Sequence, residues 1–214
     1  MDDNSAAETE ATPSDLFLDR LLDAMLALAP EMGWTRAALD RAGDKAGLSV
    51  GQALLSAPNG VPDVLEAFGK RAARAAGQGV LVADNQKVRQ KVRAGVKSWL
   101  AALEPHKPAV KRAAASPANL LTGPRGLWTA ADAIWVALGD TSTDYNWYTK
   151  RMTLVAVLGA TVTTWLGTDD EAEVDAFLDR RIENVMQFEK LKTQAKDAFA
   201  KFPDPLDVFG QRRG

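Results

Sequence analysis

GDTSTDYNWYTKRMTLVAVLGATVTTWLG, residues 139–167, is the stretch that decides the fold. Its segment from Met152 to Leu166 carries no charge, but it is shorter than the about 20 apolar residues that a membrane-spanning helix requires. Apolar residues on all sides of a helix indicate burial in the core of a sizeable all-α domain. Its threonines then need hydrogen-bond partners, which their hydroxyls can find in the preceding turn. We therefore predict an all-α fold built around this helix, whose small and hydroxylated residues could also line a cavity.

The composition excludes most catalytic and metal-binding chemistry. The 214 residues are 46% hydrophobic and 25% charged, which is typical of a protein that folds in water. They include no cysteine and one histidine, so thiolate nucleophiles, zinc–thiolate sites and histidine clusters are excluded within one chain. The sequence contains no nucleophile–base pair and no cofactor motif. We therefore predict that the protein is not an enzyme and has no catalytic residue, no metal site and no cofactor.

Residues 14–76 are predicted to form a helix-turn-helix head. Thr12-Pro13-Ser14-Asp15 is typical of a helix start, because it combines a capping hydroxyl, a proline and a carboxylate three residues after the cap. The pattern predicts a second helix from Thr35 to Ala46, a left-handed stop at Gly47 and a short third helix capped by Ser49. One long helix followed by two short helices joined by a turn is helix-turn-helix geometry.

The charge of the head argues against DNA binding. Residues 1–66 contain four basic and twelve acidic residues, a net charge of −8, whereas residues 67–112 contain eleven basic and two acidic residues. Phosphate attraction supplies most of the affinity of DNA-binding proteins, and a recognition helix needs Arg or Lys. The chain has no basic residue between Lys45 and Lys70. We therefore predict that the head, with the disordered acidic tail expected at residues 1–13, does not bind DNA.

Residues 77–192 are predicted to form a helical body. A fourth helix that begins at Val61 is expected to end near Ala76, because Gly77-Gln78-Gly79 should break or bend it. The next helix, Asn85–Glu104, has an apolar face and a strongly basic outer face. That basic face is either solvated or attracted to anionic lipid or to an acidic neighbour.

The remaining segments of the body complete a set of apolar stripes. His106 lies in a predicted exposed loop between prolines and is assigned no role, and Ser116-Pro117 is expected to start another helix. Leu127–Leu138 carries a buried face, and a helix of about 32 residues is expected from Glu171 onward. Both stripes oppose the uncharged helix Met152–Leu166. The body therefore either encloses a cavity or packs solid.

The string GDTSTDYNWYTKR at residues 139–151, followed by the apolar helix and by FLDRRIENVM at 177–186, resembles the signature of the coenzyme Q biosynthesis accessory family, the "Coq-nine" proteins. The resemblance extends, more weakly, from about Leu16 to about Lys192. It implies the fold of TetR-type transcriptional regulators, with a helix-turn-helix head followed by a lipid-binding body. Members of that family are not enzymes, and they assist the di-iron hydroxylase that acts on demethoxyubiquinone.

The resemblance implies a non-enzymatic accessory protein of ubiquinone biosynthesis that binds an isoprenoid quinone intermediate and presents it to the demethoxyubiquinone hydroxylase. The family places a terminal amphipathic helix on the membrane, but the tail here, residues 193–214, is short and interrupted by proline. The residues expected to contact the lipid are Trp135, Leu154, Val155, Leu158, Thr161, Val162, Trp165, Phe177, Leu178, Ile182 and Val185. Those expected to contact the hydroxylase are Asp144, Tyr145, Asn146, Trp147, Tyr148, Lys150 and Arg151, and those expected at the membrane are Phe199, Phe202, Phe209, Arg212 and Arg213.

Several alternatives stay open at the level of the sequence. One alternative is a TetR-type regulator with a small-molecule effector pocket, which would share the fold, but the acidic head disfavours the DNA binding that it requires. Another alternative is a scaffold whose helical body is packed solid. The acidic N-terminus lacks the pattern of a secretion signal or a mitochondrial presequence. This predicts a cytoplasmic protein of bacterial type that is peripheral on the inner membrane, or a mitochondrial matrix protein if an organellar form has been processed. The quaternary alternatives are a monomer and a homodimer.

Overall fold

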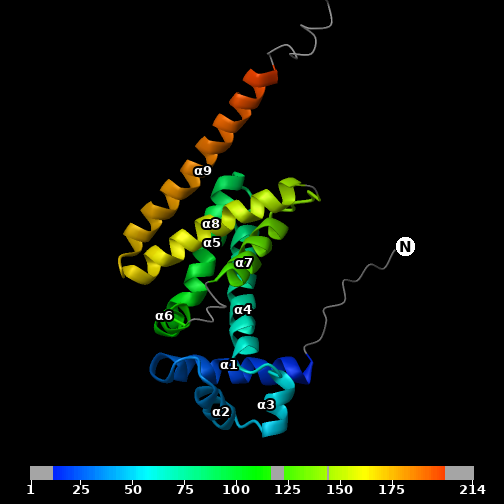
Figure 1. Cartoon of the computed structure of the whole chain (residues 1–214), viewed down its shortest axis with the longest axis vertical. Coiled ribbons are helices and arrows are strands. Elements are labelled where there is room, and N and C mark those ends of the chain that lie inside the picture. The colour runs from blue at the N-terminus through cyan, green and yellow to red at the C-terminus, as the bar shows by residue number, and fades with distance from the viewer. Residues whose placement is uncertain (1–11, 117–122, 144, 201–214) are drawn as a thin grey trace, which may run out of the picture.

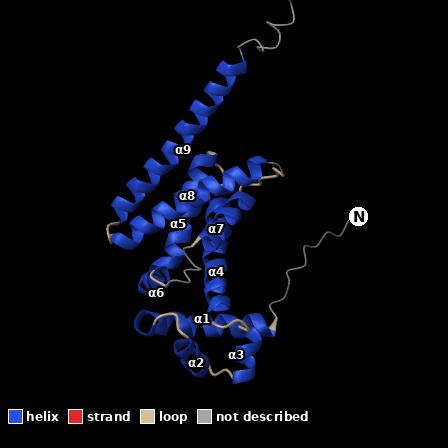
Figure 2. Cartoon of the chain, viewed as in Figure 1, coloured by secondary structure: helices blue, strands red, loops and turns tan. Residues whose placement is uncertain are grey.

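The computed structural model describes residues 12–116, 123–143 and 145–200, with the side chains described as far as residue 187. All regular structure in these residues is helical, so the all-α prediction is confirmed (Figure 2). None of the described helices is long and apolar enough to cross a membrane. The helices are α1 Pro13–Met32, α2 Arg36–Lys45, α3 Val50–Ser56, α4 Val61–Val82, α5 Val88–Leu103, α6 Lys107–Ala114, α7 Pro124–Ala137, α8 Tyr145–Gly167 and α9 Glu171–Ala200, with a 3-10 turn at Glu104–His106.

The head consists of α1, α2 and α3, and its helix boundaries are those the capping residues predict. The Thr12 hydroxyl accepts a hydrogen bond from the Asp15 amide while the Asp15 carboxylate accepts one from the Thr12 amide, which is a capping box. The hydroxyl of Thr35 accepts a hydrogen bond from the Ala38 amide at the start of α2, and Ser49 forms a second capping box with Gln52 at the start of α3. Gly47 has the predicted left-handed φ of +64°. α2 and α3 lie on the side of α1 that faces away from the body (Figure 1).

The prediction that α4 ends near Ala76 is wrong, because α4 runs unbroken through both glycines to Val82. A Cβ atom added to Gly79 would come within 2.6 Å of the Ser98 Cβ and 2.9 Å of the Ala94 carbonyl oxygen on α5. The glycine therefore permits a close crossing of α4 and α5 and does not interrupt the helix. α4 joins head and body, and the predicted domain boundary at residue 76 falls inside it (Figure 1).

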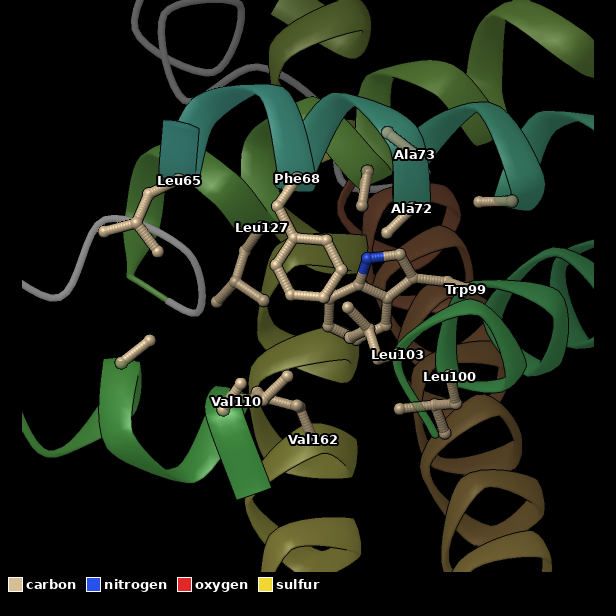
Figure 3. Packing of buried hydrophobic residues seen from close by; sticks show 14 of the residues in the cluster. Leu65, Phe68, Ala72, Ala73, Trp99, Leu100, Leu103, Val110, Leu127 and Val162 are labelled. Atoms are coloured by element: carbon tan, nitrogen blue, oxygen red, sulfur yellow. The ribbon is translucent and has the colours of Figure 1, made fainter. Parts of the chain in front are cut away.

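In the body, α5 and α7 pack against α4, α8 packs on α7, and α9 packs on α8 and α5. Its core contains Phe68 of α4, Trp99 and Leu103 of α5, and Leu127 of α7, each at most 7% exposed (Figure 3). Contacts between aromatic and branched side chains from separate helices give the body a shared apolar core. α9 begins beside α5 and α8 and then extends beyond the body (Figure 1).

α8 is buried on one face only, which corrects the prediction of burial on nearly every side. α7 and α9 cover one face of α8, where Leu154, Leu158 and Val162 are at most 4% exposed, but Met152 on the opposite face is 44% exposed. The threonines bond back to carbonyls four residues earlier, as the sequence predicts. The hydroxyls of Thr153, Thr161, Thr163 and Thr164 donate to the carbonyl oxygens of Thr149, Val157, Gly159 and Ala160.

The segment around His106 differs from the exposed loop that the two prolines suggest. It forms the 3-10 turn and leads directly into α6, and the His106 ring meets the Phe68 ring edge-on at 5.6 Å. The histidine is half-buried, and this burial, together with the nearby Arg71 charge, lowers its pKa. The helix start expected at Ser116-Pro117 extends outside the described residues.

Candidate functional site

An apolar groove of about 360 Å³ lies between α5, α7, α8 and α9. One face of α8 supplies residues separated by three or four positions, from Asn146 to Val157, which is the spacing of neighbours on a helix surface. α9 contributes three apolar side chains that face α8 across the groove. The apolar lining consists of Val88, Val92, Trp135, Leu154, Val157, Ile182, Val185 and Met186, and the polar lining consists of Arg89, Asn146, Thr149, Lys150 and Thr153.

The structure brings four of the eleven predicted lipid-contact residues to this groove, namely Trp135, Leu154, Ile182 and Val185. Several of the remaining predicted residues point into the protein core, because the apolar face of each helix is wider than the part of it that lines the groove. Trp165 lines a different pocket, Phe177 lies on an outer surface of α9, and Val155 is half-buried outside the groove. The core residues among the eleven are Leu158, Thr161, Val162 and Leu178, each at most 2% exposed.

Trp135, one of the residues that line the groove, carries a polar atom that lacks a partner. The indole nitrogen Nε1 of Trp135 is buried and has no hydrogen-bond partner among the described residues. A buried donor without a partner costs about 1–3 kcal/mol, so such groups are uncommon in folded proteins. The Lys150 ammonium lies 5.4 Å from the centroid of the Trp135 ring and also lines the groove. One end of the groove therefore combines an unpaired donor with a nearby positive charge.

A buried ionic cluster borders the groove where α7 meets α8. Arg151 is 2% exposed; its Nε donates to Asp132 at 2.6 Å and its Nη1 to Asp140 at 2.9 Å. The Asp140 side chain is 4% exposed and also accepts hydrogen bonds from Lys150 at 2.8 Å and Ser142 at 2.6 Å. These hydrogen bonds, from Lys150 first and then Ser142, hold the pKa of Asp140 well below its usual range. We call Arg151, Asp132, Asp140, Lys150 and Ser142 the buried cluster, because Arg151 and Asp140 at its centre are buried, although the Asp132 and Lys150 side chains are 41% and 40% exposed.

The predicted hydroxylase contacts fall into three different environments. The exposed residues are Tyr145 and Tyr148, which are 77% and 52% exposed. Trp147 is half-buried, with its ring 4.2 Å from the Arg151 guanidinium and 5.6 Å from the Trp128 ring. Arg151 is buried and therefore not available as a contact, and its two aspartate partners compensate for the cost of burying its charge. Asn146 and Lys150 line the groove, and Asp144 lies outside the described residues.

The residues predicted to contact the membrane cannot be placed in the same way. The side chains of Phe199, Phe202, Phe209, Arg212 and Arg213 all lie outside the described part of the chain.

The other border of the groove is a row of ion pairs between α5 and α9. The basic face of α5, for which the sequence left three interpretations open, meets an acidic neighbour within the same chain. The hydrogen bond that Arg93 donates to Asp179 and the charges of Asp179 and Asp175 raise the pKa of Arg93. The hydrogen bond that Lys97 donates to Asp175 is the first cause of the raised pKa of Lys97. We call these pairs the ladder: Arg89–Glu183 at 2.9 Å, Arg93–Asp179 at 2.7 Å, Arg93–Asp175 at 3.2 Å, Lys97–Asp175 at 2.7 Å and Lys97–Glu171 at 3.3 Å.

A second, more polar pocket of about 500 Å³ lies at the turn between α8 and α9. Its Lys107 side chain is 9% exposed, donates to Asp169 and to the Thr168 carbonyl oxygen, and lies 5.1 Å from the Trp165 ring centroid. Asp170 accepts hydrogen bonds from the amides of Ala172 and Glu173 at the start of α9, where a carboxylate is favoured by the helix dipole. The described residues contain no group of three potential ligands that could hold a metal ion.

The comparisons with known proteins agree with the sequence signature. The COQ9 family model matches residues 121–189, which include α7, α8 and α9 as far as residue 189. The chain is 28% identical to the ubiquinone biosynthesis protein COQ9, mitochondrial, of Rattus norvegicus, over 91% of this chain and 67% of that protein. It is 26% identical to the Homo sapiens protein of the same name, over 91% of this chain and 65% of that protein. A probable mitochondrial ubiquinone biosynthesis protein coq9 of Dictyostelium discoideum is 28% identical over 39% of this chain and 28% of that protein.

The fold and the groove define an all-α protein with a small three-helix head and a body that carries an apolar groove between charged borders. The match at residues 121–189 covers most of the groove, because it includes its α7, α8 and α9 walls. Together with the similarity that spans 91% of the chain, it shows that the chain is similar to the COQ9 family. The chain spans about two thirds of the length of the curated relatives.

Proposed function

We propose that this protein is a non-catalytic accessory protein of ubiquinone biosynthesis that binds an isoprenoid quinone intermediate in the groove and presents it to the demethoxyubiquinone hydroxylase. The relatives carry ubiquinone biosynthesis in their names, which supports the pathway. Their names also place them in mitochondria, so we propose peripheral contact with an inner membrane of bacterial or mitochondrial type.

The single observation that carries the proposal is the groove itself. Its volume of about 360 Å³ lies within the usual range of about 300–1,000 Å³ for small-molecule sites. Eight apolar side chains from four helices line it, and an isoprenoid chain needs such a surface because it has no polar atoms. A solid scaffold would bury these side chains against each other, whereas Val88 and Met186 are 58% and 41% exposed.

The unpaired Trp135 indole supports a direction for the ligand. We propose that the oxygenated ring lies at the Trp135 and Lys150 end, where an acceptor oxygen would satisfy the indole N–H and benefit from the ammonium charge. The isoprenoid chain would then lie along Leu154, Val157 and Ile182.

Extraction of the purified protein with organic solvent, followed by mass spectrometry, tests whether a lipid is bound. We expect an isoprenoid quinone or a related prenylated ring in the extract. Added isoprenoid quinone should also stabilise the protein by about 2.7 kcal/mol at a hundredfold excess over the dissociation constant. For a chain of this length that corresponds to a melting-temperature increase of about 5–10 °C. A lipid-free extract combined with an unchanged melting temperature would contradict the proposal.

Trp135→Phe tests the proposed orientation of the ligand, because it removes the indole donor and keeps an aromatic ring. We expect quinone affinity to fall by about threefold to tenfold, the effect of one hydrogen bond, while affinity for a saturated isoprenoid hydrocarbon stays unchanged. Trp128→Phe is the matched control, since Trp128 lies outside the groove against Trp147 and Tyr148. Equal loss for both ligands would show that Trp135 contributes shape only.

We further propose that the exposed tyrosines of α8 contact the hydroxylase. Trp147→Lys would place a second cation beside Arg151, so it is a poor probe of docking. Tyr145→Ala combined with Tyr148→Ala changes exposed side chains and should leave the melting temperature near the wild-type value. We expect at least about thirtyfold weaker hydroxylase binding, which is the loss typical of an interface hot spot. Unchanged binding would place the docking surface elsewhere, and Val50→Ala in the head serves as the control.

A TetR-type regulator is the alternative function that shares the helical arrangement of the head. Its support is the short helix α3, which presents Val50, Leu54 and Leu55 at 85%, 59% and 65% exposure. An exposed face without Arg or Lys is poorly suited to DNA, because phosphate contacts supply most of the affinity. A specific footprint on duplex DNA that survives about 150 mM salt would favour this alternative, since weak phosphate contacts are largely screened there.

A further inference from the structure

The groove has one end that is accessible to solvent and one end that is covered. At the accessible end, Val88 of α5 and Met186 of α9 are 58% and 41% exposed. At the covered end, Val157 of α8 and Ile182 of α9 are each 6% exposed. A ligand can therefore enter the groove at the end formed by Val88 and Met186.

The directions of the helices assign the other lining residues to these two ends. α9 reverses the direction of α8 after the short turn between them, so later residues of α9 face earlier residues of α8 (Figure 1). The ladder has the same order, since Arg89 at the start of α5 pairs with Glu183 while later basic residues pair with earlier acids. Lys150 and the Trp135 ring beside it therefore lie toward the accessible end, and Val157 lies toward the covered end.

The protein core closes the covered end one helical turn further on. One turn beyond the last groove residue of each helix lie Val96 of α5, Thr161 of α8 and Leu178 of α9. Each is 0% exposed, and none of them lines the groove. Core side chains are close-packed and leave few voids larger than a water molecule. A ligand chain that reaches Val157 and Ile182 therefore cannot continue along the helices.

The length of the groove limits the isoprenoid chain that it can hold. Lys150 and Val157 are seven residues apart on α8, which corresponds to about 10 Å at a rise of about 1.5 Å per residue. One isoprene unit extends a chain by four carbon–carbon bonds of about 1.5 Å, or by about 5 Å in a zigzag. The stretch from the proposed ring position to the covered end therefore holds about two units. The volume of about 360 Å³ agrees with this length, since it lies near the lower end of the range for small-molecule sites.

We propose that the groove recognises the oxygenated ring and about two isoprene units, and that the rest of a longer chain lies outside the groove. This inference rests on the proposed function, because it requires an isoprenoid quinone whose ring lies at Trp135 and Lys150. The groove then selects a ligand by its ring and its first isoprene units, and it accepts chains of any greater length. Val157 and Ile182, which end the groove, set the number of units that contribute to affinity.

A series of ubiquinones with zero to four isoprene units tests the proposal, because every member has the same ring. Dissociation constants for the full chain are measured by quenching of tryptophan fluorescence. Each buried methylene group improves affinity by about fourfold, so each of the first two units should tighten binding by at least about tenfold. The third and fourth units should together change the affinity by less than about threefold, because they lie outside the groove. A steady gain of about tenfold per unit through the whole series would overturn the proposal.

Val157→Phe shortens the groove from its covered end and tests where the chain stops. We expect this variant to lose the gain from the second unit and to keep the wild-type affinity for the quinone without a chain. Val155→Phe is the matched control, because Val155 is on the same helix but is half-buried outside the groove. It should reproduce the wild-type series. Equal series for the two variants would contradict the assignment of Val157 to the end of the groove.

Two further results separate this inference from a folding defect and from the proposed function. The melting temperature of each variant without ligand is measured first, and if Val157→Phe unfolds, Ile182→Phe places the same ring at the covered end from the opposite wall. If no quinone of the series binds the wild type, the proposed function itself falls. If quinones bind with an affinity that rises through the whole series, or that does not depend on the chain at all, the proposed function stands and only the inference falls.

Discussion

The two charged borders of the groove use similar ion pairs in different surroundings. In the buried cluster, Arg151 and the Asp140 side chain are 2% and 4% exposed, and the groups are held by several hydrogen bonds. In the ladder, Arg93 and Lys97 are 33% and 35% exposed, and the pairs remain in contact with water. Burial makes the loss of one partner costly, whereas exposed pairs contribute little to stability. We infer that the buried cluster fixes α7 against α8, while the ladder holds α9 over the groove by contacts that can open.

The largest effect is expected from Asp140→Asn, which removes one charge from the buried cluster and leaves Arg151 with a single aspartate. We expect the free energy of unfolding to fall by about 3–5 kcal/mol, because the remaining arginine charge is buried and only partly paired. Urea denaturation followed by circular dichroism measures this loss.

Asp132→Asn is the matched control for this prediction. Asp132 also accepts a hydrogen bond from Arg151, but its side chain is 41% exposed, so water can compensate for the missing charge. We expect a loss of about 1 kcal/mol, the upper end of the range for exposed pairs. Equal losses in the two variants would show that burial does not distinguish the two aspartates.

A smaller effect is expected from Arg93→Gln in the ladder. Arg93 contacts Asp175 and Asp179 across the α5–α9 interface, but all three side chains are at least 28% exposed. We expect the free energy of unfolding to fall by about 1 kcal/mol or less in low salt. At about 1 M salt, where the Debye length is about 3 Å, wild type and variant should become nearly equal. A difference that persists in high salt would mean that the ladder behaves like the buried cluster.

The smallest effect at neutral pH concerns the titration of Asp140, whose pKa in the folded protein is held well below its usual range. Because the unfolded value is about 3.9, this carboxylate stabilises the fold fully above about pH 4 and loses its contribution as the pH falls toward the folded value. Wild type should therefore lose more unfolding free energy between about pH 4 and pH 2 than Asp140→Asn, whose amide does not titrate. If the unfolding free energies of the two proteins fell in parallel over this pH range, the low pKa assigned to Asp140 would be contradicted.

The local parts of the fold could be predicted from sequence because their causes are local. Thr12, Thr35 and Ser49 cap helices within three residues, and Gly47 has the left-handed conformation that ends α2. The continuity of α4 could not be predicted in this way. Gly79 lies in a helix because α5 packs closely there, and that neighbour is not visible within a local window of sequence.

The difference between features with local causes and features that depend on distant neighbours also applies to the candidate site. Arg151 finds its aspartate partners 19 and 11 residues earlier in the chain, so its burial cannot be predicted from its immediate neighbours in sequence. The ladder did leave a signal in the sequence. Its acids recur every four residues from Glu171 to Glu183, and its basic residues recur every four residues from Arg89 to Lys97. Equal spacing on two helices indicates that the charged faces can pair in an antiparallel arrangement.

The central claim is that the groove between α5, α7, α8 and α9 binds an isoprenoid quinone, and a pair of methionine variants tests it most directly. Met186 lines the groove and is 41% exposed, whereas Met152 lies on α8 outside the groove and is 44% exposed. Thermal melts of wild type, Met186→Asp and Met152→Asp are compared with and without isoprenoid quinone. We predict that quinone raises the melting temperature of wild type and Met152→Asp equally and that Met186→Asp loses most of this increase, because a charge in the apolar lining disfavours the ligand. Equal increases in both variants, or none in the wild type, would contradict the claim.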